Sequence, residues 1–319
     1  DNPNPKVYQY DVVEDKITSF PAANNSSDAE KDNYRTRRGG VDLSTGIYYY
    51  STSADPASTT HYLYALNPVS GESWYVGKVN TQHSGQSGDL AFDDQGNMYF
   101  VVGNNNLAYV NVYNGQLPTT PSDPKINVTL RFLNQVGNSG SNTGNGVGIA
   151  YGPDGYLYVS NTAGGVYKVD PSTGSFGAAG GTLGGSGSTV DLGTCVSPST
   201  LSVAKELPDG RTDQSDQFTL SAYRGTATGP NTGTQVGQSV TTNGPDTGKQ
   251  TNQVGPVPIL TGSSNGEYWI RETASGFSSF AGYDTSYTCK DDNDASWTAD
   301  GKMTQTGNQR QAKIGAIPS

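Results

Sequence analysis

The hydrophobic positions of the first 190 or so residues recur in a fixed order. An apolar segment, a turn with glycine and an aromatic segment follow one another at 90–101, and the same pattern returns position by position at 149–160. A looser copy lies at 41–50. Two short strand-like segments around a tight glycine turn are typical of a β-hairpin. The pattern therefore predicts three hairpins in this part of the chain.

A second motif of alternating residues follows each hairpin and ends in a turn. Its copies lie at 62–71, 107–115 and 166–174, and a fourth opens the chain at 7–11 without a preceding hairpin. A hairpin and the motif after it together predict a four-stranded antiparallel sheet. A repeat of about 40 to 60 residues is the period of a β-propeller blade. We therefore expect three propeller-like blades, preceded by the outer half of another.

Two arrangements of these blades are open. The ring is either small and closed by a strand around 189–192, or the chain begins inside a longer propeller, which the halved first repeat favours. The Gly/Ser-rich stretch at 175–190 is expected to be a flexible loop or linker. We expect a propeller-like domain over 1–195, incomplete at its N-terminus in the favoured arrangement.

The pattern changes after residue 195. Short strand-like segments are separated by turn signals every ten or so residues, and no helical period is present, which predicts a β-sandwich over 196–319. The candidate strands lie at 201–207, 216–223, 255–260, 267–276 and 283–289. The polar stretch at 224–252 is expected to be a loop. The predicted fold class is all-β, with propeller-like repeats followed by a sandwich.

Composition and charge argue against some classes of function. The 319 residues carry a net charge of −10, and charged side chains make up only 15% of them. Binding of nucleic acid needs a basic stripe, and the arginines around Arg38 are expected in one local loop instead. No apolar run approaches the ~20 residues of a membrane span. Polarity comes from Ser, Thr, Asn and Gln, so we expect an extracellular protein with no nucleic-acid partner.

Catalytic motifs are not found in the sequence. His61 and His83 have no metal-ligand spacing and are expected on the surface. There is no Gly-x-Ser-x-Gly elbow, Ser/His/Asp grouping or phosphate loop. The blade interiors offer Asp42, Asp89 and Asp93, too few carboxylates to predict an axial metal. The chain is therefore expected not to be an enzyme.

The tyrosine-rich strands and one acidic cluster each allow two interpretations, one structural and one as a binding site. Alternate tyrosines are expected in the core, whereas exposed ones would stack on sugar rings. Asp291, Asp292 and Asp294 supply carboxylates that Ca²⁺ prefers, but the cluster lacks the Gly and terminal Glu of an EF-hand loop. A solvated turn is the preferred interpretation, so we expect no cofactor, with Ca²⁺ as the alternative.

The two cysteines are Cys195 and Cys289. An even number in an oxidising compartment is compatible with one disulfide between them.

Three features of the second region resemble a known family. They are Lys205 within the first strand, the strand at 216–220, and the box at 268–274 that contains Glu272. Together, over about 196–319, they resemble the prealbumin-like domains (CnaB-type or SpaA-type) of Gram-positive surface proteins and pilins. The preceding repeats are similar to the propeller in front of such domains in actinobacterial surface proteins.

The resemblance implies an isopeptide bond. In the family, a Lys on the first strand joins an Asn on the last strand, assisted by a buried Glu, and Lys205 and Glu272 match these roles. A lysine amine attacks only when neutral, which burial favours, and a protonated carboxyl group polarises the amide carbonyl. The resemblance places the last strand, with the acceptor Asn and a Cys partner for Cys289, after residue 319. By the same comparison, the partner of Cys195 precedes Asp1. Without that strand, an open sheet edge can accept a strand of another chain.

These observations predict a cell-wall-anchored or pilus-associated adhesin. The propeller would bind a host or environmental ligand, a glycan or a protein, through loops on one face, and the sandwich would be a stalk. A structural shaft subunit that contacts other subunits of a fibre is the second hypothesis. A secreted lactonase-like or lyase-like propeller enzyme is the third.

Overall fold

A computed structural model describes the chain as an all-β protein of two compact units. The units are Asp1–Pro198 and Ser199–Ser319. None of the described residues is helical, so none forms a helix that could cross a membrane. The predicted fold class is confirmed. The described residues are 6–11, 13–23, 36–53, 57–85, 87–93, 95–104, 107–136, 146–161, 165–182, 192–193, 198–226, 229–243, 247–262, 266–291 and 297–317.

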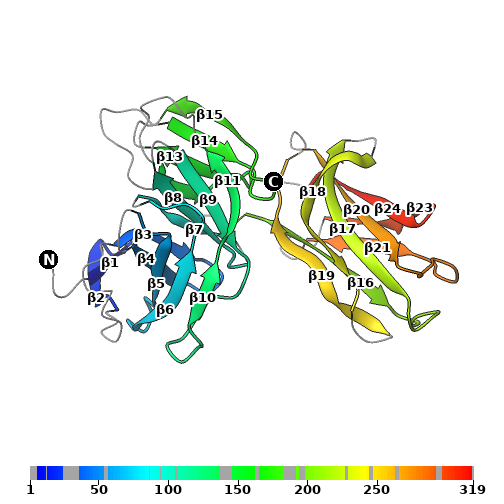
Figure 1. Cartoon of the computed structure of the whole chain (residues 1–319), viewed down its shortest axis with the longest axis horizontal. Coiled ribbons are helices and arrows are strands. Elements are labelled where there is room, and N and C mark those ends of the chain that lie inside the picture. Colours follow the sequence, from blue (N-terminus) through cyan, green and yellow to red (C-terminus); the bar gives the residue numbers. More distant parts are fainter. Residues whose placement is uncertain are drawn as a thin grey trace. The chain divides into compact units, whose positions relative to one another are not determined.

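Three consecutive sheets make up most of the first unit (Figure 1). In the first, four antiparallel strands follow one another and β10 joins the outer edge in parallel; its strands are β3 (Thr36–Asp42), β4 (Ile47–Ser53), β5 (Thr60–Leu66), β6 (Ser73–Asn80) and β10 (Ile126–Thr129). The second comprises β7 (Leu90–Phe92), β8 (Met98–Asn104), β9 (Leu107–Tyr113) and β11 (Arg131–Val136). The third comprises β12 (Gly146–Tyr151), β13 (Leu157–Asn161), β14 (Gly165–Val169) and β15 (Phe176–Thr182).

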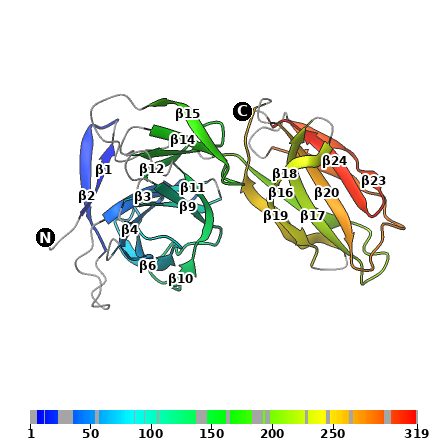
Figure 2. The ribbon, with the colours of Figure 1, turned by 45° about the horizontal axis from the view of Figure 1, so that its top comes forward.

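The half repeat at the start of the chain is a separate two-stranded sheet. Among the described strands, β1 (Lys6–Asp11) pairs with β2 (Lys16–Pro21) alone. The hairpin contacts the first sheet: the Ala23 amide donates to the Tyr50 hydroxyl at 2.8 Å, and the Ser73 hydroxyl donates to the Pro21 carbonyl at 2.9 Å. No sheet among the described residues closes into a ring, and the strand expected around 189–192 lies largely outside them (Figure 2).

A turn of one design recurs in the first and third sheets. Asp42, Asn67 and Asp170 each accept a hydrogen bond from the amide two residues on, at 2.9 to 3.0 Å. The glycine four residues on donates its amide to the carbonyl of the same Asx residue, with φ between 72° and 75°, a region that favours glycine. These glycines are Gly46, Gly71 and Gly174. The local sequence therefore sets each of these turns.

Apolar side chains fill the spaces between neighbouring sheets of the first unit. Tyr49 and Phe100 are fully buried between the first and second sheets, and Tyr99 and Leu157 are buried between the second and third. The core position expected for alternate tyrosines is therefore found at Tyr49 and Tyr99, while Tyr158 is only half-buried.

The expectation of a loop at 175–190 was wrong for its first part. β15 (Phe176–Thr182) pairs antiparallel with β14 and completes the third sheet. Because the ladder bonds come from the backbone, an edge strand needs few apolar side chains. Residues 183–191 lie outside the described residues.

The second unit is a sandwich built from three sheets. β16 (Thr200–Leu207) pairs with β19 (Gly248–Pro258), and β21 (Ser286–Lys290) pairs with β22 (Thr298–Lys302). The five-stranded sheet has the order β18 (Gly229–Thr241), β17 (Gln217–Thr226), β20 (Glu267–Ser275), β24 (Gln309–Gly315) and β23 (Thr304–Thr306). Leu201, Leu220, Val254, Ile270 and Ile314 contribute to the core.

The expectation of a loop at 224–252 was also wrong, because β18 and the first five residues of β19 lie there. The polar composition of these two strands gave no apolar alternation from which to predict them. The hydroxyl groups of Ser221 and Ser239 are 2.7 Å apart across β17 and β18, and those of Thr219 and Thr241 are 3.0 Å apart. Hydroxyl pairs of this kind stabilise a solvent-facing sheet without an apolar run.

Candidate functional site

The candidate site begins with the alternation of β16. Leu201 and Leu207 are buried, Val203 and Lys205 are half-buried, and the residues between them are exposed. Successive side chains of a strand point to opposite faces. Lys205 therefore shares the inner face with three apolar residues.

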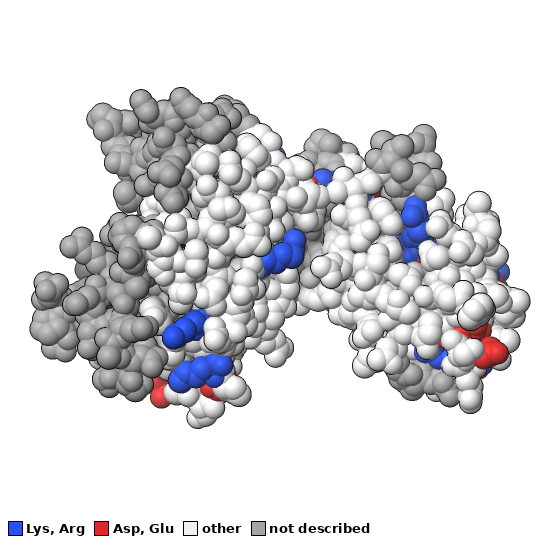
Figure 3. Space-filling model, viewed as in Figure 1, with Lys and Arg blue, Asp and Glu red and all other residues white. Residues whose placement is uncertain are grey.

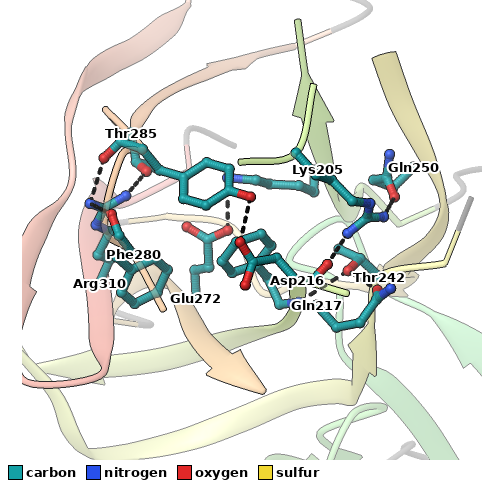
Figure 4. Close-up of polar contacts among 12 residues, drawn as sticks. Lys205, Asp216, Gln217, Thr242, Gln250, Glu272, Phe280, Thr285 and Arg310 are labelled. Atoms are coloured by element: carbon teal, nitrogen blue, oxygen red, sulfur yellow. Dashed lines mark hydrogen bonds and ion pairs between the residues drawn. The ribbon is translucent and has the colours of Figure 1, made fainter. Parts of the chain in front are cut away.

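The second member of the site comes from β20, whose alternation is strict. Tyr268, Ile270, Glu272 and Ala274 are buried and their neighbours are half-buried. Glu272 thus takes a core position in an otherwise apolar row. The Lys205 Nζ lies 2.8 Å from the Glu272 Oε1, with 12% and 2% of the two side chains exposed (Figure 4).

Aromatic rings surround the lysine. The Lys205 Nζ lies 5.1 Å from the centre of the Phe218 ring, a cation–π distance. Phe218 stacks on Phe280 and meets Tyr283 edge to face, with ring centres 5.6 and 5.1 Å apart. The Tyr283 hydroxyl donates to Asp216 at 2.8 Å, so the ring is fixed by a hydrogen bond. Packing leaves the ammonium little freedom other than to face Glu272.

Arg310 holds the loop that carries two of these rings. The guanidinium is 7% exposed, donates to the Tyr283 carbonyl at 2.7 Å, hydrogen bonds to Thr285, and lies over Phe280 (Figure 4). Sequence reasoning missed Arg310. Its alternation with Ala312 and Ile314 could have revealed it, because all three side chains point to the same inner face of β24.

The pair opens onto a cavity of about 450 Å³. The cavity is lined by residues 201–206 of β16, by residues 285–289, and by Leu220, Ile270 and Glu272. The Lys205 ammonium, 2.8 Å from Oε1, is the polar partner of the Glu272 carboxylate among the described residues. The site joins an enclosed ion pair to a space able to take a further group.

This arrangement is suited to amide chemistry. Charges are costly in an apolar site, so transfer of a proton from the Lys205 ammonium to the Glu272 carboxylate removes both charges at once. The products are a neutral amine, which is a nucleophile, and a carboxylic acid, which can polarise a carbonyl.

Cys289 lines the same cavity and is half-buried. Burial raises the pKa of its thiol above the usual value. Among the described residues Cys289 forms no disulfide. Cys195 lies outside them, so the pairing of the two cysteines stays a prediction.

The calcium alternative is not tested. Asp291 is described, whereas Asp292 and Asp294 lie outside the described residues. Within the part of the chain that the structure describes, no three His, Cys, Asp or Glu side chains group as metal ligands.

Two expectations for the first unit were wrong. His61 is fully buried, and burial, with Arg38 as a smaller cause, lowers its pKa to about 2. Arg38 lies in strand β3 and is 2% exposed; it donates to the carbonyls of Gly85, Ser87 and Val101 at 3.0 to 3.1 Å. Both can be buried because their polar atoms find partners: Arg38 reaches the Val101 carbonyl of the second sheet, and the His61 ring nitrogens lie 3.5 and 3.3 Å from the Arg38 Nη1 and the Thr81 Oγ1. His83 is half-buried and stacks on Tyr109, with ring centres 3.9 Å apart.

A polar cavity of about 570 Å³ lies in the first unit. It is lined by the turn at 42–45, Gln95 and Gly96 of the next turn, and the segment from Gln116 to Ile126. Carboxylates of Asp42 and Asp123 face it together with amide and hydroxyl groups. Asp42 is held by hydrogen bonds from the Ser44 and Thr45 hydroxyls at 2.7 and 2.8 Å. The lining combines these polar groups with Tyr49, Leu117 and Ile126.

Comparison with known proteins supports the domain content. Residues 200–316 match the model of a prealbumin-like fold domain, SpaA_3. Such a domain is consistent with a pilin-type or surface role. A search of curated proteins gave no match.

Solved structures give distant similarities. The β-propeller domain of Myceliophteria thermophila Cps50 (Swd1) is 11% identical over 60% of this chain and 55% of its own, with a TM-score of 0.39. A protein of unknown function from Bacteroides caccae is 12% identical over 60% of each chain, with a TM-score of 0.33. A candidate 6-phosphogluconolactonase from Bacteroides uniformis is 12% identical over 79% of this chain and 67% of its own, with a TM-score of 0.36. The chain thus spans about 55–60% of the first two, and no residue role is transferred from any of them.

Proposed function

We propose that this protein is an extracellular bacterial cell-surface adhesin or pilus-associated protein. In this proposal the propeller-like unit is the ligand-binding head and the prealbumin-like unit is a stalk. The observation that carries it is the enclosed Lys205–Glu272 pair within the segment that matches a prealbumin-like domain.

The stalk function rests on covalent reinforcement. The Lys205 amine attacks the side-chain carbonyl of an Asn on a strand laid along the cavity; a new C–N bond forms, the carboxamide C–N bond breaks and ammonia leaves. Glu272 gives a proton to the carbonyl oxygen and takes up the proton released from the amine. As the intermediate collapses, Glu272 passes that proton to the leaving nitrogen, which departs as NH3, and takes back the proton of the hydroxyl group, so that it ends protonated as it began. The product joins two strands side by side, so a pull along the stalk cannot separate them.

The head function rests on the polar cavity of about 570 Å³. Carboxylates, amides and hydroxyl groups are the groups that bind hydroxyl-rich ligands, because each accepts or donates hydrogen bonds. Charged side chains are few and scattered on the face in Figure 3, as expected for a chain with 15% charged residues. Because Asp42 and Asp123 line the cavity, a neutral glycan fits it better than an anionic ligand. In this proposal the head has no catalytic role and the protein needs no cofactor.

An immunoblot of producing cells tests the proposal. The cell-wall fraction is boiled in detergent and probed for this chain, before and after enzymatic digestion of the wall. A single band released only by digestion is the expected result for an anchored adhesin. A ladder of very large species would favour the shaft subunit, and a chain found only in the medium would overturn the surface assignment and favour a secreted enzyme.

The stalk chemistry has its own measurement. Intact mass of the protein purified from its natural host is expected to be lower by one ammonia than the sequence requires, with a Lys205–Asn cross-link after digestion. Glu272→Gln should abolish the loss. Glu267→Gln, on the same strand beside Lys313, is the control and should retain it.

A further inference from the structure

The polar cavity of the first unit has a buried base and an exposed rim. Asp42, Tyr49 and Pro118 are the buried members of its described lining, and Asp42 is only 5% exposed. The Tyr49 hydroxyl donates to the Pro118 carbonyl at 3.2 Å, which ties the segment from Gln116 to Ile126 to strand β4. The rim carries exposed hydroxyl and carboxamide groups, those of Ser44, Thr45, Gln95, Gln116 and Thr119.

The carboxylate at the base has only neutral donors around it. The Asp42 oxygens accept hydrogen bonds from the Ser44 amide and hydroxyl and from the Thr45 hydroxyl, at 2.7 to 3.0 Å. No Lys or Arg is among the described residues that line the cavity. Lys125, which is close in sequence, directs its Nζ to the Tyr75 carbonyl at 3.2 Å instead.

A second carboxylate, that of Asp123, enters the same cavity. It accepts hydrogen bonds from the amides of Thr119 and Thr120 at 2.8 and 2.9 Å. These bonds lower the pKa of the Asp123 carboxyl, so the group is ionised at neutral pH. The described lining therefore brings two carboxylates and no cation to one cavity.

The two charges act at one place. Burial raises the pKa of the Tyr49 hydroxyl, and the charges of Asp42 and Asp123 raise it further. Because the effect of a charge falls with distance, both carboxylates lie near the same hydroxyl. A positive group that entered beside Tyr49 would be attracted by both of them.

An organic ammonium group suits this place. It carries one positive charge and three N–H donors, and the carboxylates supply acceptors for them. Leu117 and Ile126 are half-buried members of the lining and offer apolar contact to a carbon skeleton. A hydrated metal ion would make no use of that contact.

The rim favours a sugar as the carrier of the amine. Hydroxyl and carboxamide groups pair with ring hydroxyls, because each of them donates or accepts hydrogen bonds. A lysine side chain reaches its ammonium through a bare apolar stem, so it would leave the groups of the rim without ligand contacts. An amino sugar uses both the base and the rim.

We propose that this cavity binds a sugar that carries a free, protonated amino group. The ammonium group lies toward Asp42 and Asp123, and the ring hydroxyls bond to the rim, where Gln95 and Gln116 reach them. This inference rests on the glycan-binding head proposed above and narrows its ligand, because an amino sugar adds an attraction that a neutral sugar lacks.

Three tetrasaccharides with the same β-linked backbone test the preference. Their units are glucosamine, N-acetylglucosamine or glucose, so only the group on one ring carbon differs. Calorimetric titration of the full chain at about pH 6, where a free amine is protonated, measures each Kd. The glucosamine tetramer should bind about tenfold or more tightly than the other two, as for hydrogen bonds to a charged group. Added salt should reduce this ratio.

Matched variants assign the preference to the two carboxylates. Asp42→Asn and Asp123→Asn keep an acceptor oxygen and remove the charge, so each should lower the glucosamine ratio. Asn67 occupies the same place in the turn at 67–71, which shows that this turn accommodates Asn at position 42. Asp170→Asn is the control, because Asp170 makes the same turn in the third sheet and is not among the described lining residues. It should leave the ratio unchanged.

Hydrogen exchange locates the site without any substitution. The glucosamine tetramer should slow exchange of the amides at 42–45 and 116–126. Protection confined to other segments, no binding of any tetramer, or tighter binding of tetralysine than of the glucosamine tetramer would overturn the proposal. Equal binding of the three tetramers would also overturn it but would leave a glycan-binding head in place. The surface assignment itself is decided by the immunoblot, so the two proposals can fail separately.

Discussion

The Lys205 ammonium and the Glu272 carboxylate meet at 2.8 Å although they belong to different sheets of the sandwich. Lys205 comes from β16 and Glu272 from the central β20, and both point to the shared core. One ion pair therefore connects the two layers at the place where the cavity opens.

Removal of one partner of this pair should be costly. Lys205→Met leaves the Glu272 carboxylate buried without its cation, and such losses are about 3–5 kcal/mol. The double variant Lys205→Met/Glu272→Leu should recover much of that free energy of unfolding, because no lone charge remains. Urea unfolding of the four proteins of the cycle measures the coupling.

Lys313→Met is the control for that cycle. Lys313 pairs with Glu267 at 2.8 Å, but the two side chains are 41% and 26% exposed. Its loss should cost about 0–1 kcal/mol. If Lys205→Met and Lys313→Met lowered the free energy of unfolding equally, burial of the Lys205–Glu272 pair would not explain its contribution.

Asp89 should hold the three sheets of the first unit together. Its carboxylate is 2% exposed and accepts from the amides of Gly39, Leu90 and Ile149, one from each sheet, at 3.5, 2.8 and 3.0 Å. Asp89→Leu removes the acceptor and leaves buried donors, at a cost of about 3 kcal/mol. Thermal or urea unfolding measures this, with Asp154→Leu, a more exposed partner of Lys168, expected to cost under about 1 kcal/mol.

Gly77 should tolerate no side chain. Its φ is 146°, and a Cβ there would overlap the Ile126 carbonyl, where β10 runs beside β6. Gly77→Ala should therefore displace β10 and cost about 3 kcal/mol. Gly46→Ala, at a φ of 72° with open space around it, should cost only about 1 kcal/mol. The free energies of unfolding of the two variants are compared, together with the hydrogen-exchange rates of the β10 amides. Faster exchange in Gly77→Ala alone would show a steric clash with β10, whereas equal losses would show backbone strain at both positions.

His61 should make the first unit sensitive to acid. The pKa of His61 is lowered from the ordinary 6.5 to about 2 in the folded state. Between these two pH values the unfolded chain therefore binds a proton at His61 and the folded protein does not. The stabilising contribution is complete above pH 6.5 and is lost as pH falls toward 2. The slope is about 1.4 kcal/mol per pH unit at its steepest. Between pH 7 and 4 the free energy of unfolding of His61→Gln should fall less steeply with pH than that of the unmodified protein. An unchanged slope would contradict this assignment.

Local patterns determined much of the fold. The alternation of residues predicted the hairpins at 90–101 and 149–160 because side-chain parity along a strand depends on the strand alone. The same parity put Lys205 and Glu272 on inner faces. Turns such as the one at Asp42 also follow from the residues themselves, since the Asx side chain and a later glycine make the turn.

The tertiary structure decided which elements meet. β18 and the first five residues of β19 resembled a polar loop because they are stabilised by pairing with β17 and β16, contacts that no single segment reveals. Arg38 and His61 resembled surface residues, yet distant carbonyls and rings bury them. The cavity beside Lys205 is likewise lined by residues 201–206 and 285–289, which lie far apart along the chain. A strand's own residues set which way each side chain points, but its register and neighbours depend on residues far away along the chain, so only the folded structure fixes them.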